Sequence, residues 1–391
     1  MKRGTAAAES AALDWSGADA RSRLGTGWEP AALLVLSVIL LLFGIVSVYS
    51  ASSVLAQSQD LPDYHYVVRQ VTGAAAGFVL LLAMACVDYR RLRILAWPLL
   101  FVIMLLLIAT LVPGAHSRVV NGGRRWLEIG PVGLQPSEFA KLVLIIWTAA
   151  LAVKKQDRLA SLSRGLLPFL LVWLMVMALI FAQPNLSAGV LVLLLAALVI
   201  FAAGARIGHF ILLAVVGLPL LWSQVTAAEY RIRRLIAFFD PTQDPAGISY
   251  QINQAMIAVG SGGIFGRGFG HGAQKFGYLP EPHNDFLFAM VSEEWGFIGA
   301  SAIIVLFAGF ALIGYRIARD APDLFGFLMA VGVTNLIAVQ AMLHIAVNLA
   351  LIPTTGFTLP FMSFGRSSLL VCLAAVGILI NIARRSGEVL A

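Results

Sequence analysis

The stretch Phe276-Gly277-Tyr278-Leu279-Pro280-Glu281-Pro282-His283-Asn284-Asp285-Phe286 interrupts a chain that is otherwise strongly apolar. Two carboxylates, an imidazole and an amide fall between Glu281 and Asp285. Pro280 and Pro282 fix their own φ angles and keep the segment out of a regular helix. The stretch is therefore predicted to be a stiff loop that holds polar groups at a membrane surface, and the chemistry of the protein is expected here.

The composition on either side of this stretch is that of a polytopic membrane protein. Of the 391 residues, 60% are hydrophobic and 12% are charged, and the mean hydropathy is +0.88. A soluble domain carries about 25% charged residues. The net charge of +7 fits basic cytoplasmic loops better than a nucleic-acid partner. Cys86 and Cys372 lie in apolar runs and indicate neither a disulfide framework nor a metal site.

Ten apolar segments are each close to the ~20 residues that a helix needs to cross a bilayer. The predicted fold is therefore all-α, with a ten-helix membrane domain over 29–386. Residues 1–28 are expected to form a disordered cytoplasmic tail, and 387–391 a cytoplasmic C-terminus. The predicted spans are 30–52, 67–87, 92–112, 136–153, 165–182, 186–204, 206–225, 297–315, 325–346 and 361–383.

The basic residues predict which side of the membrane each loop occupies. Of the 27 Lys and Arg residues, 16 precede the first span or follow an even-numbered span, which makes that side cytoplasmic and places both termini there. Two loops on the opposite side, about 113–135 and 226–296, are too long to be simple connections. They nevertheless carry eight cations, which indicates either an anionic substrate or contact with lipid headgroups.

Two clusters near the first outer loop are candidate substrate-binding groups. Arg124 and Arg125 suit phosphate, and Trp126 suits either a sugar face or the interfacial belt. Glu138 and Lys141 are three residues apart, so they share a helix face and can pair. A pair in so apolar a helix is a functional hypothesis, with a structural ion pair as the alternative.

Further polar residues allow more than one interpretation. Gln183-Pro184-Asn185 is adequately explained as a turn between two helices. The glycine-rich run 260–270 could bring backbone N–H groups to a phosphate or could be a flexible hinge. His344 and Asn348 are predicted to be satisfied core groups. Arg366, near the start of the last span, is unusual and could snorkel or pair with a buried carboxylate.

Taken in order, these motifs resemble the SEDS family, the FtsW/RodA membrane glycosyltransferases of bacterial cell-wall synthesis. The resemblance covers nearly everything after the tail, and the stretch from Gln274 to Glu281, like the long tail, is closer to FtsW than to RodA. The matching stretches are Gly123-Arg124-Arg125-Trp126, Gln135-Pro136-Ser137-Glu138-Phe139-Ala140-Lys141, Gly260-Ser261-Gly262-Gly263, Leu279-Pro280-Glu281 with His283 and Asp285-Phe286, and Leu359-Pro360.

The resemblance implies a ten-span fold that polymerises lipid II, the undecaprenyl-pyrophosphate-linked disaccharide pentapeptide, at the outer face of the bacterial cytoplasmic membrane. It also implies a class B penicillin-binding protein as transpeptidase partner, other divisome proteins and a place at the division septum. Asp285 matches the essential catalytic aspartate of the family. Asn185 stands where the family usually has aspartate, and Arg366 where it usually has glycine, so the charge balance of the site is expected to differ.

The implied reaction joins C1 of one lipid-linked sugar to a hydroxyl of another and expels an isoprenoid pyrophosphate. It needs a base near the acceptor and cations near the leaving group. Inversion at C1 requires no enzyme nucleophile, and a divalent cation, Mg²⁺ or Mn²⁺, could assist. Asp285 is the expected base, Glu281 and His283 would orient the acceptor or tune Asp285, and the other substrate-binding candidates are Arg124, Arg125, Trp126, Glu138, Lys141, Arg231 and Lys275.

Three alternatives stay open at this point. A lipid II flippase would place its key polar groups at mid-membrane in broken helices, often with inverted repeats, whereas here most of them lie in outer loops and no repeat is visible. A division scaffold without catalysis would not need the polar cluster at 281–285. An elongation role of the RodA type is the third alternative.

Overall fold

The structure, a computed structural model, describes residues 27–112, 114, 117–120, 123–130, 132–242, 247 and 249–388. Nearly all of the predicted N-terminal tail, residues 1–26, lies outside the described residues, as do Asn121, Gly122 and the last three residues of the chain.

In the described part of the chain, ten helices correspond to the ten predicted spans. Nine helical stretches there are long and apolar enough to cross a membrane, and α6 is among them only together with the π-helical turn Leu162–Leu166 that precedes it. Helix α7, with 17 residues, is shorter. The helices are α2 (Glu29–Ser58), α3 (His65–Cys86), α4 (Arg90–Leu111), α5 (Pro136–Lys154), α6 (Leu167–Ala182), α7 (Leu186–Ala202), α8 (Ile207–Thr226), α11 (Leu287–Arg319), α12 (Leu324–Asn348) and α13 (Arg366–Glu388).

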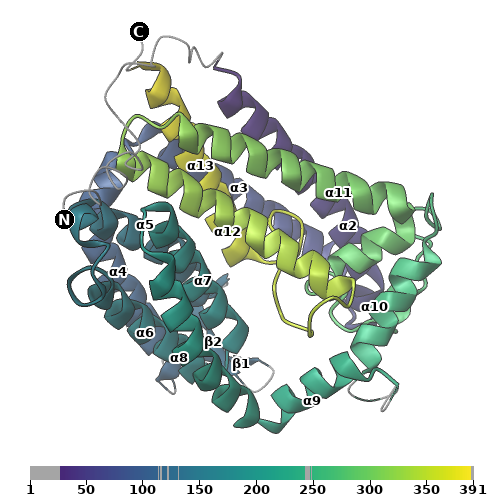
Figure 1. Cartoon of the computed structure of the whole chain (residues 1–391). Helices are drawn as coiled ribbons and strands as arrows, with labels where there is room; N and C mark the ends of the chain where they lie inside the picture. Colours follow the sequence, from purple (N-terminus) through teal and green to yellow (C-terminus); the bar gives the residue numbers. More distant parts are fainter. Residues whose placement is uncertain are drawn as a thin grey trace.

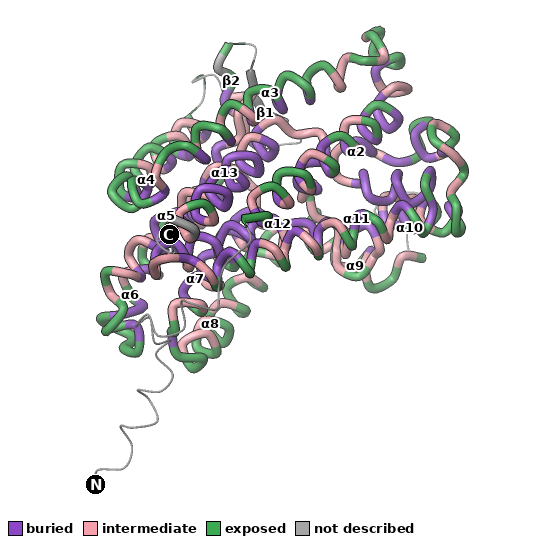
Figure 2. Tube along the Cα trace, turned by 90° about the horizontal axis from the view of Figure 1, so that it is seen from above, coloured by how far each residue is buried: buried purple, intermediate pink, exposed green. Residues whose placement is uncertain are grey.

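The exposed surface of α8 is apolar, as expected for a helix that contacts lipid. None of its residues is buried, and Val215, Leu218 and Trp222 are 59% to 64% exposed. Figure 2 shows α8 and α4 as largely exposed helices around a buried centre. Such a continuous exposed apolar surface marks a membrane-facing helix.

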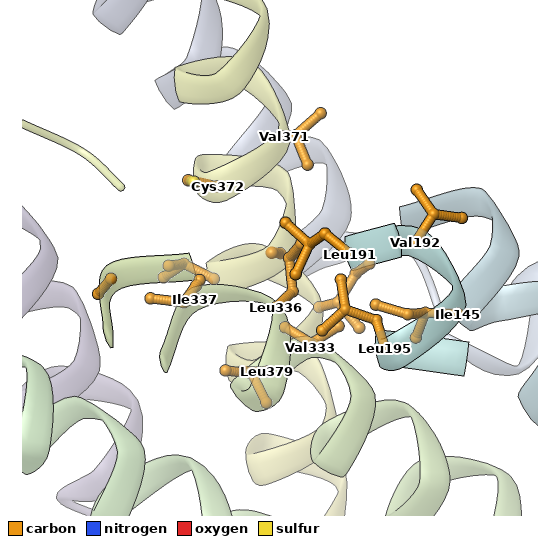
Figure 3. Close-up of a cluster of buried hydrophobic side chains, with 14 of the residues drawn as sticks. Ile145, Leu191, Val192, Leu195, Val333, Leu336, Ile337, Val371, Cys372 and Leu379 are labelled. Atoms are coloured by element: carbon orange, nitrogen blue, oxygen red, sulfur yellow. The ribbon is translucent and has the colours of Figure 1, made fainter. Parts of the chain in front are cut away.

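The buried centre is formed by α5, α7, α12 and α13. Figure 3 shows their side chains meeting, with Ile145, Leu195, Val333 and Leu379 among the labelled residues. Each of these four is fully or almost fully buried. Helix α12 is, with α13, one of the two most buried of the described spans. Its position brings the polar residues near its C-terminal end to the middle of the molecule.

Close glycine contacts join α3 to α13. A Cβ on Gly77 would lie 2.4 Å from Leu373, and a Cβ on Gly377 would lie 2.4 Å from the carbonyl oxygen of Leu81. Gly73 stands one turn before Gly77 and lies against Arg366. Small residues spaced in this way let the backbones of two membrane helices approach and pack closely.

The first outer loop contains a small antiparallel sheet that the all-helical prediction did not include. Its strands are β1 (Ser117–Val120), β2 (Gly123–Ile129) and β3 (Val132–Leu134), in the order β1-β2-β3. Side chains alternate along β2, so that Leu127 is buried while Glu128 is exposed. A stretch of only seven residues with this period is easily missed beside long apolar helices.

The second outer loop is mostly helical. It contains α9 (Glu229–Phe239) and α10 (Tyr250–Ser261), and Figure 1 shows α9 crossing between α8 and α10 on the side where β1 and β2 lie. Helix α11 starts at Leu287, although the sequence predicted a start at 297. Gly296 explains the difference, because its φ of 66° and ψ of −161° break α11 there.

The glycine-rich run packs directly against this break. The amide of Arg267 donates to the carbonyl of Glu293 at 3.0 Å, and the amide of Phe297 donates to the carbonyl of Gly263 at 2.9 Å. A Cβ on Gly296 would lie 2.3 Å from the amide nitrogen of Gly266. The glycines thus allow two backbone segments to pack together. This role differs from both interpretations of the run from sequence, phosphate binding and a flexible hinge.

Replacing Gly296 with alanine should destabilise the protein. A conformation that is almost restricted to glycine costs about 1–3 kcal/mol for other residues, and the close contact adds to this. Gly309→Ala, in the regular part of α11, is the matched control. Its Cβ would meet only Leu36 at 3.8 Å, so it should be neutral or slightly stabilising. Equal thermal unfolding midpoints for the two variants in detergent would contradict this account of the break.

Candidate active site

The segment that carries Asp285 is a tight loop between η4 (Gln274–Phe276) and α11. Gly277 adopts a left-handed conformation with φ 94°, and the amide of Leu279 donates to the carbonyl of Gln274 at 3.1 Å. The amide of Asp285 then donates to the carbonyl of Glu281 at 3.1 Å. The predicted non-helical loop is confirmed, and its turn places Glu281 and Asp285 on successive bends of one chain segment.

Three successive carbonyls of this loop are bonded by residues distant in sequence. The amide of Phe364 donates to His283 at 3.0 Å, Ser363 Oγ donates to Asn284 at 2.8 Å, and Asn348 Nδ2 donates to Asp285 at 3.1 Å. Sequence reasoning missed these positioning groups, because nothing local connects residues 348 and 363 with residue 285.

His283 is buried among aromatic rings. Its ring centroid lies 4.8 Å from that of Tyr66 and 5.4 Å from that of Phe364. Burial lowers the pKa of His283 to about 4, so the ring is neutral near pH 7. Its Nε2 lies 3.9 Å from a Glu281 oxygen, which is not an ion pair for a neutral imidazole. This environment suits positioning of the loop, and a contact with substrate stays a prediction.

Asp285 has the electrostatic setting of a general base. Its pKa is raised to about 7, mainly by removal from water and also by the neighbouring Glu281 carboxylate, whereas Arg234 and Arg125 oppose the shift. The side chain is partly accessible, and a Cβ on Gly356 would lie 3.7 Å from Oδ2. A carboxyl group that titrates near neutral pH can accept a proton efficiently at that pH.

The cations near Asp285 come from two different loops. Arg125 on β2 donates to the carbonyls of Gln183 at 3.0 Å and Pro184 at 2.6 Å, which fixes its guanidinium. Arg231 and Arg234 lie on α9, and both are close enough to Arg125 to lower its pKa. The sequence analysis named Arg125 and Arg231 but not Arg234, although Arg234 belongs to the same basic run.

Arg124 and Trp126 flank Arg125 on β2. Both are partly exposed, and a Cβ on Gly133 would lie 3.6 Å from the Trp126 ring. Their alternation with Arg125 places them on the opposite face of the strand. The structure thus separates the three residues into two faces, and the substrate contacts proposed for Arg124 and Trp126 stay predictions.

Lys275 occupies a different environment from these arginines. It is buried, and its Nζ donates to the carbonyl of Gly270 at 2.5 Å. The Phe276 ring lies beside the ammonium, with its centroid 5.7 Å away. In the described part of the chain, Lys275 therefore ties together the loop before the catalytic segment, and a phosphate contact stays a prediction.

Glu138 and Lys141 form the predicted pair, and the pair belongs to a larger network. Lys141 Nζ donates to Glu138 at 2.8 Å and to Gln340 Oε1 on α12 at 2.6 Å. Gln340 Nε2 donates in turn to the carbonyl of Thr358 at 2.9 Å. Lys141 is only 2% exposed, so this network joins α5, α12 and the segment before α13 inside the protein.

Two buried carboxylates on α11 were not recognised from the sequence. Glu293 accepts from the amides of Ala273 at 2.8 Å and Gln274 at 3.2 Å, and Arg267 lies 3.5 Å away. Glu294 accepts from Ser50 on α2. These partners make both glutamates anchors for the outer loop.

The two departures from the family pattern also have defined positions. The Asn185 side chain caps α7 by accepting from the amide of Ala188 at 3.4 Å. Arg366 lies across Gly73 of α3, at the first turn of α13. The structure shows no carboxylate paired with Arg366 among the described residues, so of the two alternatives, snorkelling or a buried carboxylate partner, the second is not found there.

Breaking the Lys141 network should be costly. Lys141→Ala leaves Glu138 without its cation, and loss of one partner of a fully buried pair costs about 3–5 kcal/mol. Lys141→Ala should therefore lower the unfolding midpoint, and adding Glu138→Gln should recover part of the loss. Additive losses in the double variant, measured by thermal unfolding, would show that the two residues do not act as a unit.

Comparison with known proteins supports the resemblance to the SEDS family. The family model described as cell cycle protein, for FtsW, RodA and SpoVE, matches residues 31–388. Stage V sporulation protein E of Bacillus subtilis is 42% identical, over 90% of this chain and 96% of that protein. The "Probable peptidoglycan glycosyltransferase FtsW" of Trichlorobacter lovleyi is 43% identical, over 90% and 92%.

Solved structures confirm the predicted fold. One chain, from work described as "Structural coordination of polymerization and crosslinking by a peptidoglycan synthase complex", gives a TM-score of 0.74 at 31% identity, over 90% of this chain and 97% of that chain. The rod shape determining protein RodA of Thermus thermophilus gives 0.66 at 29% identity, over 90% and 95%. The chain therefore belongs to the FtsW/RodA/SpoVE family, the SEDS proteins.

Proposed function

We propose that this protein is a peptidoglycan glycosyltransferase that polymerises lipid II into glycan strands. The observation that carries the proposal is Asp285, a partly accessible carboxyl group with a pKa of about 7, beside the cations of β2 and α9. Relatives named FtsW, at 36% to 43% identity over most of the chain, are peptidoglycan glycosyltransferases by name.

Asp285 would act as the general base. Its ionised carboxylate would accept the proton of the acceptor sugar hydroxyl while that oxygen attacks C1 of the donor sugar. The bond from C1 to the pyrophosphate oxygen breaks in the same displacement, so the configuration inverts and no covalent enzyme intermediate forms. The loop contacts from Phe364, Ser363 and Asn348 would keep the carboxylate in place during this step.

The cations would stabilise the leaving pyrophosphate. Arg231 and Arg234 stand on α9, which is largely exposed, and Arg125 is fixed by the carbonyls of the α6–α7 connection. Guanidinium groups bind phosphate through two parallel N–H donors. Charge developing on the pyrophosphate oxygen would therefore meet donors that are already positioned.

A divalent cation is part of the proposal only as an aid to this step. In the described part of the chain, no group of three or more His, Cys, Asp or Glu side chains is arranged to hold a metal. Mg²⁺ is often bound by one or two carboxylates together with substrate phosphates. Glu281 and Asp285 could provide such ligands once lipid II is bound.

The cellular setting follows from the relatives and from the charge distribution. Basic residues on the other side of the bundle support a position of the Asp285 loop at the outer face of the cytoplasmic membrane, with both termini inside. Names of relatives favour septal division of the FtsW type, with spore formation as the SpoVE-like variant. The similar peptidoglycan synthase complex supports a class B penicillin-binding protein as the crosslinking partner, with other division proteins around it.

Asp285→Asn should nearly abolish polymerisation. The amide keeps the shape of the side chain but cannot accept the proton, and a general base typically contributes 10²–10⁴-fold. The assay is glycan product from lipid II with purified protein, alone and with the transpeptidase partner. Lipid II binding should survive, because the phosphate contacts lie on β2 and α9.

Asp240→Asn is the matched control for this variant. Asp240 lies in the same outer loop, is exposed and accepts from Thr242, so its replacement should leave product formation unchanged. Product from Asp285→Asn at the wild-type rate would eliminate Asp285 as the base. It would favour the flippase or scaffold alternatives if the product came from an associated enzyme.

The pH profile should report the same carboxyl group. Because only ionised Asp285 can accept a proton, kcat/KM for lipid II should rise about tenfold per pH unit below its pKa of about 7 and level off above it. His283, with its pKa lowered to about 4, stays neutral throughout this range and should add no second step.

Substitutions at two neighbours of Asp285 should move the midpoint of the pH profile in opposite directions. Arg234→Gln removes a cation that lowers the pKa of Asp285, so the midpoint should rise. Glu281→Gln removes an anion that raises it, so the midpoint should fall. Shifts in the same direction, or a profile without a step near pH 7, would assign the titration to another group.

A further inference from the structure

A cavity of about 710 Å³ lies at the other end of the bundle from Asp285, where the cytoplasmic basic residues gather. The first turns of α4 and α12 and the last turn of α5 form its walls. No residue of the proposed active site takes part. The lining residues are Arg90, Arg93, Ile94, Val153, Asp323, Leu324 and Phe325.

The charges in this cavity leave one cation available. Asp323 is fully engaged, because Arg90 Nε lies 3.0 Å from its Oδ2, Tyr89 donates to the same oxygen at 2.6 Å and the amide of Gly326 donates to Oδ1 at 2.7 Å. The exposed side chain of Arg93 has neither an ion pair nor a hydrogen bond with another residue that the structure describes. The cavity is therefore suited to a single anionic group.

The wall beyond Arg93 is apolar and faces lipid. Ile94 is 78% exposed, Trp97 is 60% exposed and Phe101 is 64% exposed. Arg93, Trp97 and Phe101 are four residues apart, so they follow one face of α4 and step about 6 Å deeper each time. A cation, an indole and a phenyl ring in this order match the headgroup, interfacial and acyl regions of a bilayer leaflet.

We propose that this cavity binds an anionic phospholipid of the cytoplasmic leaflet. The headgroup phosphate would accept from Arg93, beside the Arg90 guanidinium that Asp323 holds, and one acyl chain would lie along Ile94, Trp97 and Phe101. A free phosphate would use only the cationic end, and a soluble peptide would not explain the exposed apolar stripe. Basic pockets between membrane helices on the cytoplasmic side are suited to such headgroups. The inference is independent of the proposed catalysis.

The test measures lipid that stays with the purified full-length protein. Wild type and variants are reconstituted in nanodiscs of equal phosphatidylglycerol and phosphatidylcholine, extracted with detergent, and the retained lipids are quantified by mass spectrometry. Wild type should retain phosphatidylglycerol preferentially. Arg93→Gln should lower the ratio of the two lipids about fivefold, the effect expected for one arginine near a membrane surface.

Two further variants separate the cavity from general surface charge. Arg91→Gln removes a neighbouring exposed cation that does not line the cavity, so the ratio should change by less than about twofold. Val153→Trp fills the cavity while every charge is kept, and it should lower the retained phosphatidylglycerol as Arg93→Gln does. Thermal unfolding midpoints check that each variant is folded.

Several results would overturn the proposal. Equal losses from Arg91→Gln and Arg93→Gln would mean diffuse attraction to the membrane surface. Equal retention of both lipids by wild type would mean an apolar crevice without headgroup recognition. Displacement of retained phosphatidylglycerol by free glycerol phosphate would mean that the phosphate alone is recognised. If folded wild-type protein retained no lipid, the cavity would not be a lipid site, and a protein segment would be its occupant.

Discussion

The position of Asp285 depends on the requirement that non-helical backbone inside a membrane protein finds hydrogen-bond partners. Neither lipid nor apolar side chains can replace water around a free carbonyl, so an unpaired group is costly. The carbonyls of His283, Asn284 and Asp285 meet this requirement through Phe364, Ser363 and Asn348. Asn348 also accepts from the amide of Ala289, so α12 holds both the loop and the first turn of α11. The segment that carries Asp285 is thus oriented mainly through its backbone, and these contacts leave its side chains available.

The sequence predicted those features that depend on neighbouring residues. Apolar length located ten helices, and three-residue spacing predicted the pair of Glu138 and Lys141. Features that join distant segments could not be predicted this way, because hydropathy reports contact with lipid and not which helices are neighbours. Gln340, 199 positions from Lys141, completes that network, and Asn348 reaches Asp285 only through the fold. The break at Gly296 could not be predicted either, because it depends on the close approach of the distant segment around Gly266.

The Arg and Lys residues of the two outer loops have several different structural roles. As a group they had indicated either an anionic substrate or contact with lipid headgroups, yet Arg125 is bonded to carbonyls of the α6–α7 connection and Lys275 to the carbonyl of Gly270. Arg267 lies beside the buried carboxylate of Glu293. Long basic side chains can therefore satisfy carbonyls and carboxylates within the outer loops. The other cations near Asp285 are on α9, where Arg231 donates to the carbonyl of Gln224 at 2.6 Å and Arg234 is exposed.

The exposure of α9 affects how the charge near Asp285 could be balanced before and after the pyrophosphate leaves. An arriving pyrophosphate would raise the pKa of Asp285 through its negative charge, and nearby cations would offset that effect. In the proposed reaction, Asp285 would have gained a proton after transfer and the pyrophosphate would depart, so both changes would leave surplus positive charge. A fully buried cation left without its partner costs several kcal/mol. Arg231 and Arg234 lie where water can solvate them once the anion has gone, whereas Lys141 keeps Glu138 as a permanent partner. Solvated arginines beside a poorly solvated base can therefore accept and release an anionic leaving group without destabilising the fold.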